Sequence, residues 1–238
     1  MRNSIHKVIN KLNINVGNIN RNDQSGALHR AWGHIYTNHI RGDYVEFGVY
    51  QGSSMTSSYT NYSQFKLWLD QQVRSNEAWR RQLFADFQDY MPVFHGLDTF
   101  EGMPENNEEN RLFGADTFMS NYESVRSLIS KTIPEQQYRL YKGLFNDTSD
   151  ELVLNLKDNI AIAHIDADLY FSARDALNII KSRIQTGTVI LFDDYNAFNA
   201  DKNKGERLAF KEFRADFHLE FESWFSYGYS GHAFLCIG

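Results

Sequence analysis

A β-prone run followed by two glycines limits what this chain can fold into more than any other stretch. Residues 44–47 read YVEF, Gly48 and Gly52 follow, and Ser53 begins a run of small residues typical of the start of a helix. The pattern predicts a strand, a glycine loop and a helix. Because glycine has no Cβ, such a loop lets a ligand approach the backbone closely, as in a nucleotide-binding α/β fold. Two glycines alone also fit an ordinary strand-to-helix turn.

Glu46 narrows the choice of ligand for this loop. The spacing Glu-x-Gly-x-x-x-Gly is neither the Gly-x-Gly-x-x-Gly of dinucleotide folds nor the P-loop pattern, and no lysine follows to neutralise a triphosphate. A carboxylate at this point would repel a pyrophosphate, so ATP is disfavoured. It suits a ligand with a cationic end, such as the amino group of S-adenosylmethionine.

Length and composition indicate one soluble domain. The 238 residues are 42% hydrophobic with a net charge of −6, which suits an α/β domain over residues 42–238 after an N-terminal arm and helix over residues 1–41. No dense run of Lys and Arg supports nucleic acid as a partner. The single cysteine, Cys236, excludes an intrachain disulfide and a cysteine-rich zinc site. No signal-type or membrane-spanning apolar run is present, so we expect a cytoplasmic protein without a membrane partner.

Two predicted strands separated by one helix each end in a pair of acids. A continuous apolar run ends in Asp166 and Asp168, and the next strand, over residues 188–192, ends in Asp193 and Asp194. In a βαβ unit these carboxylates meet at the edge where open α/β sheets bind ligands. Close like charges are costly unless a cation lies between them, and oxygen ligands suit a hard divalent ion, so a metal site is predicted. Alternatively, one or two of the acids, Asp168 above all, cap the following helices.

Asp98 ends the strand predicted over residues 92–98. An acid at this point holds the ribose hydroxyls in nucleoside-binding α/β folds, so Asp98 is the ribose candidate, with a solvated turn acid as the alternative. The acidic, turn-rich stretch that follows predicts a lid within residues 101–130. A helical insertion is expected near residues 59–90, between the glycine loop and this strand.

The C-terminal part predicts how the sheet closes. An amphipathic helix is expected over residues 208–217, followed by two strands joined by a hairpin turn. Seven strands that close with an antiparallel pair are the layout of class I methyltransferases. We therefore predict a Rossmann-like α/β three-layer sandwich with a mostly parallel seven-stranded sheet and an antiparallel C-terminal strand.

Five motifs follow one another along the chain. They are GDYVEFGVYQG at residues 42–52, DTFEGMP at 98–104, GLFNDT at 143–148, HIDADLY at 164–170 and DDY at 193–195. With all five in this order, the sequence resembles the macrocin O-methyltransferase family, metal-dependent class I methyltransferases that modify hydroxyls of natural-product sugars. The insertion and the N-terminal arm depart from the family pattern. We expect these two regions to shape the choice of substrate and the assembly of the protein, for which a homo-oligomer is one expectation.

The resemblance implies a cofactor, a metal and a reaction. S-adenosylmethionine would be bound by the glycine loop, the ribose acid and two further positions: Glu46, Gly48, Tyr50, Gly52, Ser53, Asp98, Asp147 and His164. A divalent ion, Mg²⁺ first among the candidates, would be held by Asp166, Asp193 and Asp194. The reaction would be methyl transfer to a hydroxyl of a sugar-containing or other small natural product, with Asp166 or Asp168 as the catalytic base.

Two other functions fit parts of the sequence. Asp166-Ala167-Asp168 after an apolar strand is also the Asp-x-Asp pattern of metal-dependent glycosyltransferases, but such an enzyme has no use for Glu46 in its glycine loop. A non-catalytic binding module with the S-adenosylmethionine fold is the second alternative, and the complete set of acids argues against it. Tight binding of a nucleotide sugar without S-adenosylmethionine would favour the first; cofactor binding without methyl transfer would favour the second.

Overall fold

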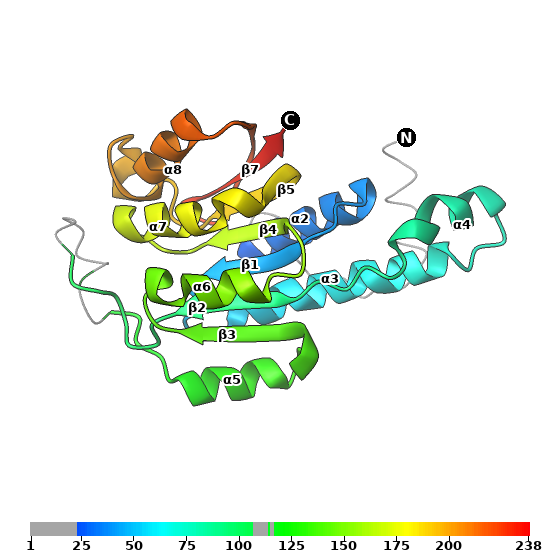
Figure 1. Ribbon diagram of the computed structural model, residues 1–238, viewed down its shortest axis with the longest axis horizontal. Helices are drawn as coiled ribbons and strands as arrows, with labels where there is room; N and C mark the ends of the chain where they lie inside the picture. Colours follow the sequence, from blue (N-terminus) through cyan, green and yellow to red (C-terminus); the bar gives the residue numbers. More distant parts are fainter. Residues whose placement is uncertain (1–22, 107–113, 115–116) are drawn as a thin grey trace.

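One sheet organises the chain in the computed structural model, which describes residues 23–106, 114 and 117–238. Within these residues the sheet has seven strands in the order β3-β2-β1-β4-β5-β7-β6 (Figure 1). The strands are β1 (Asp43–Phe47), β2 (Phe94–Asp98), β3 (Tyr138–Lys142), β4 (Ile160–Ile165), β5 (Ile184–Phe192), β6 (Glu220–Tyr227) and β7 (Gly231–Ile237). Neighbours among β1 to β5 pair in parallel, whereas β7 runs antiparallel to β5 and β6. The predicted mostly parallel sheet with an antiparallel C-terminal pair is confirmed.

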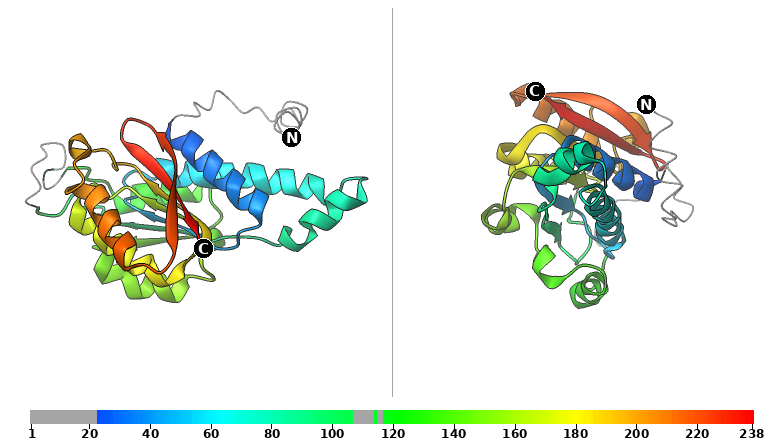
Figure 2. Two further views of the ribbon diagram at one scale, coloured as in Figure 1. Left: turned by 90° about the horizontal axis from the view of Figure 1, so that it is seen from above. Right: turned by 90° about the vertical axis from the view of Figure 1, so that its right-hand side faces the viewer.

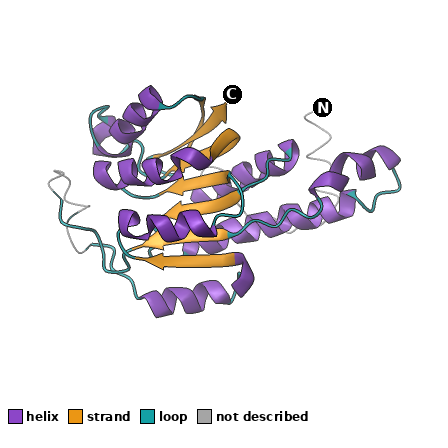
Figure 3. Ribbon diagram, viewed as in Figure 1, coloured by secondary structure: helices purple, strands orange, loops and turns teal. Residues whose placement is uncertain are grey.

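Helices cover both faces of this sheet (Figure 3). They are α2 (Gln24–Asn38), α3 (Ser53–Gln72), α4 (Ala78–Phe84), α5 (Tyr122–Ser130), α6 (Phe145–Asn155), α7 (Tyr170–Ile180) and α8 (Gly205–Asp216), with the 3₁₀ turns η1 (Ala85–Phe87), η3 (Glu135–Gln137), η4 (Lys181–Arg183) and η5 (Phe198–Ala200). Side chains of α2, α3 and α5 share one hydrophobic core with the strands, and those of α6, α7 and α8 share a second core. The result is the predicted three-layer sandwich. None of the described helices is both long and apolar enough to cross a membrane.

The central strands are buried on both faces, which explains their apolar sequences. Every residue of β1 and β4 is buried. Along β1, Tyr44 packs into the first core and Val45 and Phe47 into the second, because successive side chains of a strand point to opposite faces. The register pairs Phe47 with Leu97 on one side and with Ile165 on the other. The carboxyl ends of β1, β2 and β4 therefore lie level, at the left of Figure 1.

The long connection between β1 and β2 is helical. It contains α3, α4 and η1, and the far end of α3 extends with α4 beyond the sheet, at the right of Figure 1 and of the left panel of Figure 2. Trp79 and Leu83 on α4 are exposed, whereas Phe87 in η1 is buried in the first core. The division at residues 41 and 42 and the part that this insertion plays in substrate choice stay predictions.

Two predicted features fall partly outside the described residues. Of the N-terminal region over residues 1–41, the structure describes residue 23 onward, which includes α2. Of the lid predicted within residues 101–130, residues 107–113 and 115–116 are not described. The lid therefore stays a prediction.

Candidate functional site

The glycine loop after β1 has backbone angles that few side chains allow. Gly48 and Gly52 have φ of 92° and 81°, and Tyr50 between them has φ of 48°. A Cβ at Gly48 would lie 2.0 Å from the backbone oxygen of Asp166, so a residue other than glycine does not fit without a shift of the backbone. The loop therefore lies directly against the segment that follows β4.

Asp98, at the end of β2, fastens this loop from the neighbouring strand. Its Oδ2 accepts hydrogen bonds from the backbone N–H groups of Val49, at 2.8 Å, and Tyr50, at 2.7 Å. Its Oδ1 accepts one from the N–H of Phe100, at 2.6 Å. Burial raises the pKa of Asp98, and the three N–H groups act in the opposite direction. These contacts make Asp98 a support of the glycine loop; its contact with a ribose stays a prediction.

Glu46 lies fully buried in β1, beneath the loop. Its carboxylate accepts hydrogen bonds from the hydroxyl of Tyr44 and, at 2.6 Å, from Oγ of Ser54 at the start of α3. Nδ1 of His164, on the neighbouring strand β4, lies 3.6 Å from the same carboxylate. Glu46 thus joins β1, β4 and α3 in one polar network. Its predicted contact with the amino group of a cofactor is not tested by these contacts.

His164 lies between Glu46 and Asp193, one of the predicted metal ligands. Its ring is fully buried, and its Nε2 is 3.8 Å from Oδ1 of Asp193. Burial alone would lower the pKa of His164, but Asp193 and Glu46 outweigh it and hold this pKa well above its usual value. Burial alone would raise the pKa of Asp193, but His164, Gln24 and Tyr227 outweigh it and lower this pKa. Asp193 therefore faces a buried histidine whose protonated form is favoured by the carboxylates on both sides of it.

Three carboxylates gather where β4 and β5 end. Oxygens of Asp166, Asp168 and Asp194 lie within 4.8 Å of one another. Two of them are predicted metal ligands and Asp168 is a predicted base, whereas Asp193 is not part of this group in the described part of the chain. Asp168 has φ of 54°, a left-handed conformation that Asp adopts more readily than most residues. We refer to Asp166, Asp168 and Asp194 as the acid cluster.

The charges around the acid cluster suit a hard divalent cation. Burial, followed by the charge of Asp193, raises the pKa of Asp166, and burial, followed by Asp194, raises the pKa of Asp168. A cation between the carboxylates would relieve this repulsion. Because Mg²⁺ and Ca²⁺ bind oxygens at about 2.0–2.6 Å, two oxygens on one ion lie at most about 5 Å apart. The potential ligand atoms of the acid cluster are all carboxylate oxygens within that limit, so these residues fit Mg²⁺, Mn²⁺ or Ca²⁺.

Glu206, in the first turn of α8, belongs to this site although no sequence motif marked it. Its carboxylate is fully buried and accepts hydrogen bonds from the N–H groups of Ala167, at 3.3 Å, and Asp194, at 3.0 Å. Burial, followed by the charges of Asp194 and Asp166, raises the pKa of Glu206 well above its usual value. The helix was predicted from residue 208, where apolar periodicity begins, whereas α8 begins at Gly205. The signal that the sequence did offer for Glu206 was an acid at the start of a predicted helix, where the helix dipole favours negative charge.

A cavity of about 520 Å³ lies beside the ends of β2 and β3. Its walls include Thr99 after β2, Lys142 and Gly143 at the end of β3, and the exposed Asp147 in the first turn of α6. The predicted Asp147 therefore lies next to the strand end that carries Asp98. Hydrogen-bond donors and carboxylates in such a cavity suit the polar edge of a nucleoside.

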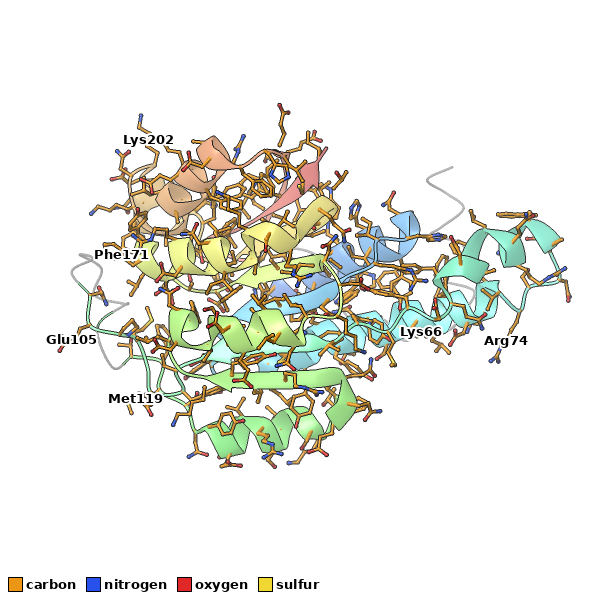
Figure 4. The ribbon with its side chains drawn as sticks, in the orientation of Figure 1. Lys66, Arg74, Glu105, Met119, Phe171 and Lys202 are labelled. Atoms are coloured by element: carbon orange, nitrogen blue, oxygen red, sulfur yellow. The ribbon has the colours of Figure 1, made fainter. Side chains whose placement is uncertain are left out.

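Apolar side chains are exposed near the same edge of the sheet. Tyr50 is partly exposed, and its ring meets the ring of Phe118 edge-on, with centroids 5.8 Å apart. Phe118, Met119 and Phe171 are also exposed, and Met119 and Phe171 both lie at the left edge of Figure 4. Ser53, the remaining predicted cofactor residue, is the exposed first residue of α3. The predicted cofactor residues and the acid cluster therefore occupy one end of the sheet, and Glu46 and His164 lie buried beneath it.

Comparison with known proteins gives a family for this arrangement. The family model described as macrocin-O-methyltransferase (TylF) matches residues 20–222 of the chain. A curated relative from Streptomyces olivaceus, the 8-demethyl-8-(2,3-dimethoxy-alpha-L-rhamnosyl)-tetracenomycin-C 4'-O-methyltransferase, is 23% identical over 66% of this chain and 54% of its own length. The demethyldecarbamoylnovobiocin O-methyltransferase of Streptomyces niveus is 24% identical over 78% of this chain and 63% of its own length. The chain thus spans less than two thirds of each of these relatives.

Solved structures show the same fold. The O-methyltransferase NovP superposes with a TM-score of 0.66 at 20% identity, over 90% of this chain and 79% of NovP. An O-methyltransferase from Bacillus cereus, solved in complex with SAH, superposes with a TM-score of 0.54 at 13% identity, over 99% of this chain and 90% of its own. At these identities the likeness supports the fold alone. The family model, in contrast, matches most of the chain, and it shows that the chain belongs to the macrocin O-methyltransferase family.

Proposed function

We propose that the protein transfers a methyl group from S-adenosylmethionine to a hydroxyl of a small, sugar-containing natural product, with the help of a divalent ion. The observation that carries this proposal is the position of the acid cluster against the glycine loop, where Gly48 packs on the backbone of Asp166. The names of both curated relatives support methyl transfer to oxygen, and one of them names a rhamnosyl-bearing substrate. A cytoplasmic location is part of the proposal and accords with the free, buried Cys236.

The glycine loop and the neighbouring cavity are the places for the cofactor. S-adenosylmethionine, when bound, supplies an electrophilic methyl group. Gly48 and Gly52 let the loop pack closely on Asp166 and on α5, and Asp147 lines the cavity proposed for the nucleoside part, next to the strand end that carries Asp98. Because Asp98 also fastens the loop, it would fix the position of the ribose relative to the loop. The SAH in the structure of the B. cereus neighbour supports this ligand class.

The acid cluster is the place for the acceptor hydroxyl. A divalent ion held by Asp166, Asp168 and Asp194 would lower the pKa of that hydroxyl. A carboxylate oxygen of Asp166 or Asp168 accepts the proton, while the hydroxyl oxygen forms a bond to the methyl carbon and the sulfur–methyl bond breaks. Asp193, predicted as a metal ligand, stays a candidate for the same ion, because its charge acts on Asp166 more strongly than that of Asp194; it also contacts His164.

The exposed aromatic side chains at this edge of the sheet support an acceptor with an apolar part. Phe118 and Phe171 are exposed, and exposed aromatic side chains can pack against a ring system attached to a sugar. A nucleotide sugar, the substrate of the glycosyltransferase alternative, would bring a diphosphate toward Glu46, which is buried beneath the glycine loop. We therefore favour methyl transfer over glycosyl transfer.

Binding of S-adenosylhomocysteine tests the cofactor site. The intact protein should bind it, and Asp98→Ala should weaken binding by about 1–3 kcal/mol, roughly 5- to 150-fold, because the variant loses a charged hydrogen-bond acceptor and loosens the loop. Calorimetry measures both affinities, with Asp150→Ala, an exposed acid on α6, as the control. No binding to the intact protein would contradict the proposed function. An unchanged affinity in Asp98→Ala would contradict the role of Asp98 alone.

The pH dependence of cation binding tests the acid cluster. The raised pKa values of Asp166 and Asp168 mean that these groups keep their protons to higher pH than a free aspartate. A cation must displace those protons, so its affinity should increase with pH, by about tenfold per unit for each proton displaced. In the cation-free protein, the protons on Asp166 and Asp168 stabilise the fold at low pH. This stabilisation is lost as the pH rises through the raised pKa values of these two groups. Titration with Mn²⁺ at about pH 6 and about pH 8 should therefore show tighter binding and a larger thermal stabilisation at the higher pH; equal affinities would contradict the assignment.

A further inference from the structure

Glu206 connects the two segments that carry the acid cluster. Ala167, whose N–H donates to Oε1, lies between Asp166 and Asp168 after β4. The N–H that donates to Oε2 belongs to Asp194 itself, after β5. Glu206 lies 39 residues from the first donor and 12 from the second, so one side chain from α8 bridges two separate strand ends.

Ordinary helix capping does not account for this arrangement. A carboxylate in the first turn of a helix stabilises that helix by about 0.3–1 kcal/mol when it faces the helix's own N–H groups. The oxygens of Glu206 instead accept from residues outside α8. The side chain is also fully buried beside other acids. Such a position costs stability, which indicates a role for Glu206 outside α8.

We propose that Glu206 is a positioning residue, which holds the segments after β4 and β5 at the spacing that lets Asp166, Asp168 and Asp194 share one divalent cation. This inference rests on the proposed function, because it assumes that the acid cluster binds a cation. Both oxygens are needed: each accepts one N–H, and each N–H belongs to a different segment. The side chain acts through the backbone of its neighbours and is not itself a ligand.

The variant Glu206→Gln separates this role from simple packing. Glutamine has nearly the same volume, but its amide offers one oxygen and one NH₂ group, so one of the two backbone N–H groups would face a donor. The segments should then lose their fixed spacing. Because partners of metal ligands contribute roughly 10- to 100-fold to metal affinity, we expect the dissociation constant for Mn²⁺ to rise by about that factor.

The control is Glu212→Gln, on the same helix. Glu212 accepts a hydrogen bond from the hydroxyl of Tyr170 at the protein surface, so this variant makes the same chemical change away from the acid cluster. The melting temperature of cation-free Glu206→Gln shows whether the variant is folded, so that Mn²⁺ affinities are compared between folded proteins.

The experiment is calorimetric titration of the cation-free proteins with MnCl₂, together with thermal unfolding. Weaker Mn²⁺ binding in Glu206→Gln, with unchanged binding in Glu212→Gln, would support the inference. Equal Mn²⁺ affinity in the wild type and Glu206→Gln would overturn the inference and leave the proposed function standing, whereas no Mn²⁺ binding by the wild type would overturn both. If Glu206→Gln does not fold, Glu206→Asp decides: its shorter side chain withdraws both oxygens from the N–H groups, so an unchanged affinity in this variant also overturns the inference.

Discussion

Excess chelator should abolish methyl transfer, and Asp166→Asn should lower kcat on the order of 10³-fold in saturating Mg²⁺, about 4 kcal/mol of lost transition-state stabilisation. The reason is that Asp166 contributes an oxygen to the acid cluster and lies against the glycine loop at Gly48. Asparagine keeps the shape but carries no charge, so the cluster loses part of its attraction for a cation and one of its two candidate bases. Formation of S-adenosylhomocysteine with a rhamnosyl-bearing acceptor measures the effect.

Cofactor binding should survive both treatments. The cofactor and the cation use different residues, so affinity for S-adenosylhomocysteine should change by no more than about twofold in chelator or in Asp166→Asn. Asp216→Asn, at the exposed end of α8, is the matched control and should leave turnover unchanged. Full turnover in excess chelator would mean that the carboxylates act only as base and helix caps, and the metal-assisted mechanism would then be wrong.

The fold was predictable because local and global signals agree in its central strands. β4 reads as a continuous apolar run because both of its faces are covered by helices, and such a run is typical of a buried parallel strand. The glycine loop was predictable for a related reason: Gly48 touches the backbone after β4, and only glycine allows that approach. The parallel order of β1, β4 and β5 then brings the strand-end acids to one edge.

The roles of adjacent acids were harder to predict. Asp193 and Asp194 follow the same strand in a bend, where the alternation of strand side chains no longer applies. Asp194 belongs to the acid cluster, whereas Asp193 contacts His164 and its charge also acts on Asp166. Sequence alone does not say which acid takes which direction, because this depends on where the strand ends relative to its neighbours.

The contacts of three buried residues became visible only in the structure. Glu46 and His164 are cross-strand partners in β1 and β4, which explains how residues far apart in the chain form one polar network. Glu206 depends on contacts from a helix that begins before its apolar pattern does. Periodicity locates the buried face of a helix, and it carries no information about which acid at the first turn meets a strand end across the sheet.

Of the alanine substitutions at the glycines of this loop, Gly48→Ala should destabilise the protein most. The new Cβ would lie 2.0 Å from the backbone oxygen of Asp166, and φ of 92° is unfavourable for alanine as well. Because the clash is with backbone, either β1 or the segment after β4 must move. We expect a loss of more than about 3 kcal/mol in the free energy of unfolding, or roughly 6–12 °C in melting temperature.

Gly228→Ala separates the two causes of this loss. Gly228, in the turn between β6 and β7, has φ of 56°, and a Cβ there would meet no heavy atom within 4 Å. It therefore reports the backbone cost alone, which is about 1–2 kcal/mol for a residue in the left-handed region, or roughly 2–8 °C. Chemical denaturation of both variants measures the difference. An equal loss in the two would mean that the contact between Gly48 and Asp166 yields easily, and then the glycine loop does not fix the position of the acid cluster.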